Sequence, residues 1–183
     1  MTTYIWYRVQ MSSNSQDRAG PIENFCFALA HAHRELIDLA TASRHALEQN
    51  CAPLEVQRAI EAFADTLLNH HRSEDVFFFP AFREAGRLTP ADESFIAERD
   101  AEHVPIHELA VELRENAASM TDPVARERAA AIIDRLINQS ASHFAAEERY
   151  LTVHRVGAIV TPQEMIAIQR HMGTNWHRGR TTG

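Results

Sequence analysis

Histidines and glutamates recur at a four-residue spacing in two separate segments of this 183-residue chain. His70 precedes Glu74 in one segment, and His143 precedes Glu147 in the other. Side chains four residues apart lie one turn from each other on the same face of an α-helix. A buried imidazole or carboxylate is costly unless it is paired or bound to a metal. The two pairs therefore predict a metal site, provided that both helices turn them inward.

Further histidines fall on the predicted inner faces of other helices. His33 lies on an otherwise apolar stripe at the heptad spacing of a bundle interior. His103 follows Ile96 by one heptad, and His107 comes one turn later. His71 belongs to a row at the edge of the predicted inner face, so we predict that it does not bind the metal. The predicted metal-binding set is His33, His70, Glu74, His103, His107, His143 and Glu147.

The predicted turns bring this set to nearly one level along the bundle. Residues on antiparallel neighbouring helices lie at the same level when they are equally far from the turn that joins them. His33 and His70 are equally far from the first predicted turn, at residues 50–53. The residues on the following helices are placed in a similar way about the second and third turns. Agreement in both helical phase and level favours one shared cluster.

The chemistry of the set favours two metal ions. Imidazoles and carboxylates without a thiolate suit iron, manganese or zinc. The set has too many ligands for one tetrahedral zinc, whereas Glu74 and Glu147 could each bridge two ions. In a pair of six-coordinate ions, five histidines, two bridging carboxylates and a shared oxo or hydroxo group leave one position open. A small diatomic molecule could bind there.

Other metal and nucleotide motifs are missing. No histidine has a glutamate three residues before it, as the ferritin-like di-iron bundles require. HExxH, GxSxG, P-loop and GxGxxG motifs are also absent from the sequence.

The composition restricts partners and location. The net charge of −7 argues against nucleic acid as a main partner. The sequence has no apolar run near 18 residues, so we expect no membrane span. The N-terminal stretch lacks the features of a signal peptide, which favours a cytoplasmic location.

The elements that must position the cluster are predicted to be helices. Helical periodicity dominates, with breaks near residues 50–53, 86–90 and 119–123. The predicted fold is all-α: an up-down-up-down four-helix bundle with a short additional C-terminal helix. The expected helices cover about residues 21–49, 53–85, 91–118, 123–156 and 162–172. The expected organisation is an N-terminal tail at 1–20, the bundle at 21–157, and a short C-terminal helix and tail at 158–183.

Four segments of the sequence carry a resemblance to a known family. They are AHREL (32–36), HHRSEDVFFFP (70–80), EHVPIH (102–107) and HFAAEERYL (143–151). Together they resemble the hemerythrin-like family, also called the HHE cation-binding domain, over about residues 22–155. The resemblance implies a four-helix bundle around a non-haem di-iron centre, with two iron ions joined by an oxo or hydroxo bridge. Ligand chemistry alone leaves manganese or zinc open. The family's ligand positions correspond to His33, His70, Glu74, His103, His143 and Glu147.

Two details set the chain apart from the oxygen-carrying members of that family. The spacing of His103 and His107 copies theirs, but Pro105 stands between the two histidines. Oxygen carriers have Asp five residues after the histidine of the fourth helix, whereas Glu147 comes four residues after His143. These departures favour the broader HHE group, whose activities vary.

The leading functional hypothesis is a di-iron protein that binds O2 or a related small diatomic for storage, sensing or detoxification. One alternative is an oxidative or nitrosative stress enzyme acting on peroxide or NO, or repairing iron–sulfur clusters, at the same centre. Another is a non-catalytic metal-binding interaction module. In that case the aromatic N-terminal stretch could mediate association, for example as a homodimer.

Overall fold

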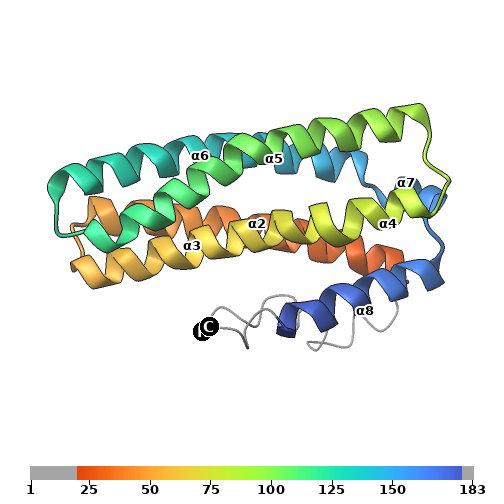
Figure 1. The fold of residues 1–183 in the computed structure, drawn as a ribbon, viewed down its shortest axis with the longest axis horizontal. Coiled ribbons are helices and arrows are strands. Elements are labelled where there is room, and N and C mark those ends of the chain that lie inside the picture. Colours follow the sequence, from red (N-terminus) through yellow and green to blue (C-terminus); the bar gives the residue numbers. More distant parts are fainter. Residues whose placement is uncertain (1–19, 179–183) are drawn as a thin grey trace.

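A computed structural model describes residues 20–178 of the chain, with side chains up to residue 171. Every regular element in this range is a helix, and no strand occurs within it (Figure 1). The predicted all-α class is therefore confirmed, while residues 1–19 of the tail predicted at 1–20 lie outside the described residues. The elements are α2 (Pro21–Glu48), α3 (Pro53–Ser73), η2 (Glu74–Phe78), α4 (Phe79–Glu84), α5 (Pro90–Asn116), η3 (Ala117–Ser119), α6 (Pro123–Tyr150), α7 (Val153–Ile159) and α8 (Pro162–Arg178).

The long helices begin at the signals that the sequence carries. A proline stands in the first turn of α2, α3, α5 and α6, where its missing N–H removes no helical hydrogen bond. Thr89 caps α5: its hydroxyl accepts from the Asp92 backbone N–H, and its own N–H donates to the Asp92 carboxylate. Asp122 caps α6 through the N–H of Val124. These signals fix where each helix begins, and hence the level of each of its side chains along the bundle.

Four long helical segments lie side by side and share one interior (Figure 1). Helix α2 packs on α3 and α6, and α5 packs on the same two helices from the other side. Helix α8 lies against α2 and η2. No helix within residues 20–178 has both the length and the apolar content that crossing a membrane requires.

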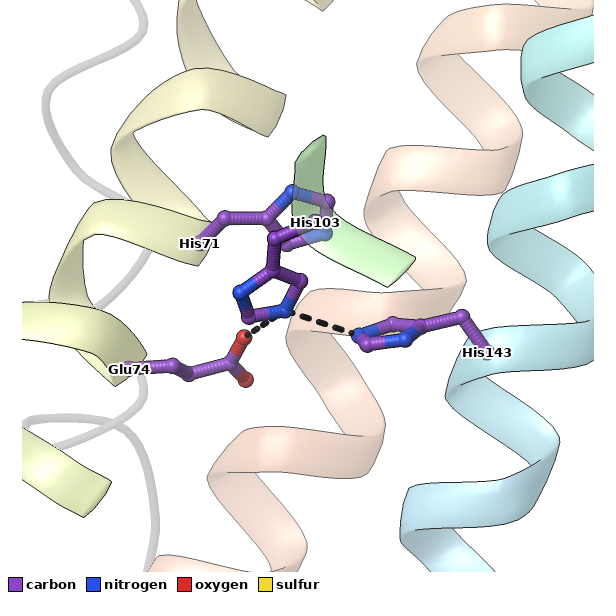
Figure 2. Close-up of side chains that lie close together, drawn as sticks. All are labelled: His71, Glu74, His103 and His143. Carbon is purple, nitrogen blue, oxygen red and sulfur yellow. Dashed lines mark hydrogen bonds and ion pairs between the residues drawn. The ribbon is translucent and has the colours of Figure 1, made fainter. Parts of the chain in front are cut away.

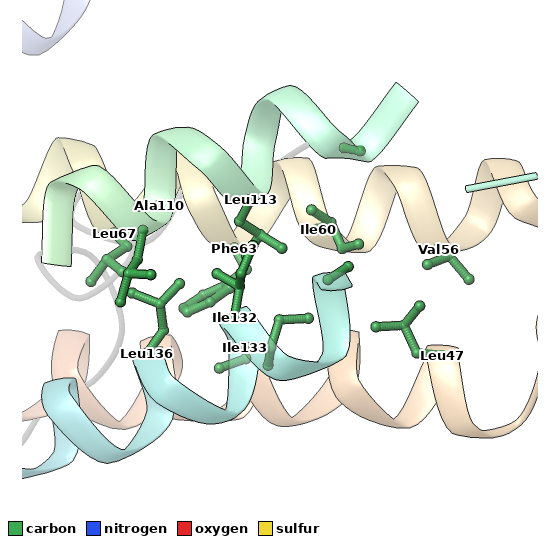
Figure 3. Packing of buried hydrophobic residues seen from close by; sticks show 14 of the residues in the cluster. Leu47, Val56, Ile60, Phe63, Leu67, Ala110, Leu113, Ile132, Ile133 and Leu136 are labelled. Carbon is green, nitrogen blue, oxygen red and sulfur yellow. The ribbon is translucent and has the colours of Figure 1, made fainter. Parts of the chain in front are cut away.

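Two apolar cores lie at different levels along this interior. The first core packs around Phe63, Leu113 and Leu136 (Figure 3). The second core contains Phe25 and Phe78, whose ring centroids are 4.5 Å apart, and it includes residues of α7 and α8. Each of the four long segments has at least one predicted ligand between residues of the first core and residues of the second: His33, His70 with Glu74, His103, and Glu147. The polar cluster therefore forms a layer between two apolar cores.

A π-helix interrupts the second long segment at this layer. Element η2 begins at Glu74, directly after α3. A π-helix adds a residue to the helical turn and occurs often at functional sites. As a result Phe78 and Phe79 are buried, and Phe77 is only partly buried. A regular heptad from His70 would place Phe77 on the inner face, but the π-turn shifts the phase by one residue, and Phe78 lies there instead.

The C-terminal part differs from the expected single helix ending near residue 156. Helix α6 ends at Tyr150, and a separate α7 starts behind Thr152, whose hydroxyl accepts from the N–H of Arg155. Helix α8 extends to Arg178, further than predicted. These two helices close the end of the second core.

Candidate metal centre

Seven inward-facing side chains form two adjoining groups in the polar layer. In each group, the nitrogen or oxygen atoms that could bind a metal lie within 4.8 Å of one another, and every residue is buried. Figure 2 shows the group of His71, Glu74, His103 and His143, whose side chains converge from η2 and the adjacent helices. The two-histidine group consists of His33, His70, Glu74 and Glu147. The three-histidine group consists of His71, Glu74, His103 and His143.

Glu74 faces both groups at once. Its Oε1 lies 3.3 Å from Nε2 of His70, in the two-histidine group. Its Oε2 lies 3.4 Å from Nε2 of His103, in the three-histidine group. One carboxylate thus offers one oxygen to each side, which is the arrangement of a bridging ligand.

Glu147 has the same arrangement on the opposite helix. Its Oε2 lies 3.2 Å from Nε2 of His33, and its Oε1 lies 3.5 Å from Nε2 of His143. Both glutamates are almost fully buried. The two groups are therefore joined by two carboxylates, as a two-metal site requires.

Many polar atoms of this layer have no hydrogen-bond partner within the protein. They include both carboxylate oxygens of Glu74 and Glu147, Nε2 of His33 and His70, and both ring nitrogens of His71. A buried polar atom without a partner costs about 1–3 kcal/mol, and native interiors contain few such atoms. So many orphaned donor atoms pointing at one place fit bound cations. These imidazole nitrogens and carboxylate oxygens are thus suitable ligands for bound metal cations.

The outer nitrogens of three of the histidines are held by carboxylates. Because an ionised carboxylate only accepts, each Nδ1 carries the hydrogen and donates it. In the neutral ring, the inner Nε2 is then left with a lone pair directed at the cluster. The pairs are His33 with Glu148 at 2.9 Å, His103 with Asp75 at 2.6 Å and His143 with Glu102 at 2.8 Å.

Burial dominates the protonation of the metal-free layer. Together with the nearby Glu147, it raises the pKa of Glu74 to about 8. Burial also raises the pKa of Glu147 to about 8. The pKa values of His70 and His71 are lowered well below the usual range, by burial and then by neighbouring imidazoles. Neutral imidazole is the form that binds metal. Cations that bind here must displace the protons of the two carboxyl groups.

His103 is the exception among these histidines. Burial lowers the pKa of its imidazole, but the hydrogen bond to Asp75 and the nearby carboxyl group of Glu74 outweigh burial and raise it to about 10. In the metal-free protein His103 is therefore positively charged, and it pairs with the carboxylate of Asp75.

The structure places His71 differently from the prediction. His71 is fully buried and belongs to the three-histidine group, so the prediction that it lies at the edge of the inner face is wrong. Its ring stacks on that of His103, with centroids 4.2 Å apart. The heptad neighbours of His71 are Ala64 and Phe78, which are both apolar, and this row already carried a signal of burial.

His107 stands outside both groups. It is only partly buried, and its ring centroid lies 5.5 Å from that of His71 and 6.3 Å from that of His103. Helix α5 continues through Pro105, the residue between His103 and His107. The structure brings the other six residues of the predicted set together, and it adds His71 where the sequence had placed His107.

An aromatic wall closes the two-histidine group. Phe144 stacks on His33 with centroids 4.1 Å apart and planes inclined by 5°. Its ring also stands edge-on to His70 at 5.4 Å. Phe144 is buried and belongs to the first core. The wall limits the space beside these two histidines and keeps it apolar.

Together the bundle and its paired groups define a helical protein with a buried cation-binding centre. The family model for the hemerythrin HHE cation binding domain matches residues 27–151, about two thirds of the chain. The chain belongs to this family. No curated protein and no solved structure gives a significant match to it.

Proposed function

We propose that this chain is a hemerythrin-like di-iron protein that reversibly binds O2 or another small diatomic molecule. The observation that carries the proposal is the pair of glutamates, Glu74 and Glu147, each with one oxygen beside a histidine of either group. Two ions held by two shared carboxylates can act together on one small ligand. Iron supplies the redox change that reversible O2 binding needs.

The proposed ligand set differs from the sequence-based one at a single histidine. His71 takes the place of His107 because its two nitrogens are buried and unpartnered within the three-histidine group. His107 then serves as a neighbour that packs on His71. The proposed ligands are His33, His70, His71, Glu74, His103, His143 and Glu147.

Counting donors places the open position on the two-histidine side. The three-histidine group would offer one ion three nitrogens and one oxygen from each glutamate, and the two-histidine group would offer the other ion two nitrogens and the remaining oxygen of each glutamate. The ion with fewer protein donors would be held beside His33, whose ring stacks on Phe144. A small uncharged ligand fits an apolar wall better than a large or charged one does.

Fold and location form part of the same proposal. Short connections at residues 49–52 and 120–122 support an up-down-up-down order of the four long helices, with residues 21–157 as the metal-binding unit. A cytoplasmic location agrees with free thiols at Cys26 and Cys51.

Metal analysis and optical spectra test the proposal. We expect two iron ions per chain, and an absorption band of the reduced protein that changes on adding O2 and reverts when O2 is removed. His31→Ala is the matched control because His31 is half-exposed on α2 and lies outside both groups. Fewer than one metal per chain, with no further loss in His70→Ala, would contradict the di-metal centre. Fast reoxidation without a stable adduct would instead favour turnover of the ligand.

A further inference from the structure

Three partly exposed carboxylates next to the metal centre share an unusual position in the sequence. Asp75 directly follows Glu74, Glu148 directly follows Glu147, and Glu102 directly precedes His103. Each is thus the chain neighbour of a proposed ligand. None belongs to the two buried groups of the centre.

Each of these carboxylates holds a histidine on a different helix. From η2, Asp75 accepts from His103 on α5, and from α5, Glu102 accepts from His143 on α6. From α6, Glu148 accepts from His33 on α2. The three hydrogen bonds therefore run in one direction around the bundle and link all four long segments.

These bonds fix both the orientation and the tautomer of each ring. An imidazole with Nδ1–H held by a carboxylate keeps the Nε2 lone pair free, whereas the other tautomer would point a hydrogen at the metal position. The Nε2 atoms of His33, His103 and His143 lie 3.2–3.5 Å from the shared glutamates, facing the centre.

We propose that Asp75, Glu102 and Glu148 are positioning residues that hold the histidines of the neighbouring helix by Nδ1, with Nε2 turned to the centre, so that the ligand rings are oriented before metal binds. The proposal rests on the proposed function for the identity of the centre. The hydrogen bonds themselves exist in the metal-free protein, and they can be tested there.

Glu102 offers the sharpest test because a buried arginine fixes its other oxygen. Arg99 is 6% exposed, and its guanidinium donates to Oε1 of Glu102 at 2.7 Å, while Oε2 accepts from His143. The Cζ atom of the same guanidinium lies over the ring of Phe95, 5.1 Å from the ring centroid. The Glu102 side chain itself is 44% exposed and lines a groove of about 460 Å³ between α5 and α6. Its replacement therefore removes a hydrogen bond without opening a cavity in the core.

The first measurement is the nitrogen chemical shift of the His143 ring in metal-free protein at pH 7. Burial lowers the pKa of His143 to about 4, so the ring is neutral there and its tautomer can be read directly. We expect Nδ1–H in the unmodified protein and a mixture of tautomers in Glu102→Ala. Glu102→Gln should restore part of the Nδ1–H form, because the amide oxygen can still accept.

The second measurement is the rate at which a chelator removes metal from the loaded protein. Loss of such an outer partner typically costs ~10–100-fold in metal affinity, so we expect about tenfold faster release of one of the two ions in Glu102→Ala. Glu148→Ala should likewise speed release of one ion, because Glu148 holds His33 in the other group. Glu98→Ala is the matched control: Glu98 lines the same groove, one turn from Glu102, and contacts no histidine.

Two results would overturn the positioning role. One is an unchanged His143 tautomer in Glu102→Ala, and the other is release from both Glu102→Ala and Glu148→Ala within twofold of the control. If the unmodified protein binds no metal, the proposed function fails, but the tautomer measurement still decides the positioning role.

Discussion

The two halves of the metal centre share their carboxylates but differ in their surroundings. In the three-histidine group the rings pack on one another, with Nε2 of His103 and Nε2 of His143 only 3.1 Å apart. In the two-histidine group, His33 packs instead on the apolar ring of Phe144. Nitrogen donors thus saturate one half, while an aromatic wall borders the other. If two ions bind as proposed, this difference would hold one ion more firmly and leave the other with a position for a ligand.

Removing a shared carboxylate should abolish both halves together. We expect Glu74→Ala to lose both metal ions, because each group then lacks a bridging oxygen and keeps unpaired imidazoles. Elemental analysis of the purified variant measures this. Glu84→Ala is the matched control, since Glu84 lies in the same helical segment on the exposed surface. Retention of one full equivalent of metal in Glu74→Ala would show that the halves are independent.

Removing a single nitrogen donor should separate the halves. His71→Ala is expected to lower the metal content from two ions to one, because only the three-histidine group loses a ligand. His107→Ala should keep both ions, since His107 lies outside either group. Metal content and the optical spectrum of the pair of variants measure the difference. The reverse pattern would restore His107 as the fifth histidine and remove His71 from the centre.

The aromatic wall should matter for stability and for ligand binding rather than for metal content. We expect Phe144→Ala to keep two ions but to lower the free energy of unfolding by about 3–5 kcal/mol, the usual cost of removing a buried Phe. Denaturant unfolding of the metal-loaded protein measures this change. Phe27→Ala is the control, because Phe27 is 63% exposed and its loss should change stability by less than about 0.5 kcal/mol. Equal losses in the two variants would contradict the packing role of Phe144.

The smallest effect should be a pH dependence that both halves share in the metal-free protein. Glu74 and Glu147 have pKa values of about 8 in the folded state, against 4.5 for an ordinary glutamate. Above pH 4.5 the unfolded chain has released these protons, whereas the folded chain still binds them. Proton binding by the two glutamates therefore stabilises the folded state, and this contribution is lost as the pH rises towards 8. The raised pKa of His103 acts in the same direction above pH 6.5.

The melting temperature of the metal-free protein should therefore fall between pH 6.5 and 8. The lowered pKa values of His70 and His71 do not obscure this window, because they act below pH 6.5. Glu74→Gln should reduce the fall, since the amide does not titrate. A melting temperature that rises across the same window would contradict the protonated state of the two buried glutamates.

The sequence allowed much of this architecture to be predicted, for identifiable reasons. Prolines at helix starts located the turns, and heptad spacing gave the inward phase of His33 and His143. Phase and level together then placed both glutamates in one layer. These inferences hold because they depend on regular helical geometry.

The features that the sequence did not predict depend on departures from regular helical geometry or on contacts between helices. The π-turn at Glu74 replaced Phe77 by Phe78 on the inner face, and no composition signal marked it. His71 was assigned to an edge because the inner face of α3 was taken to be narrower than it is. The outer carboxylate at Glu102 looks on the sequence like any exposed acid, since its role arises only from the neighbouring helix.

The position of the polar layer between the two apolar cores has a consequence for how the molecule unfolds. Without metal, the cores meet across a level of buried imidazoles and carboxyl groups, several of whose atoms have no hydrogen-bond partner, so we expect each core to loosen with little resistance from the other. Bound ions would tie all four long helices at that level and merge the cores into one cooperative unit. Metal loading should thus convert a broad thermal transition into a sharp one. The centre would then stabilise the fold as well as bind a ligand.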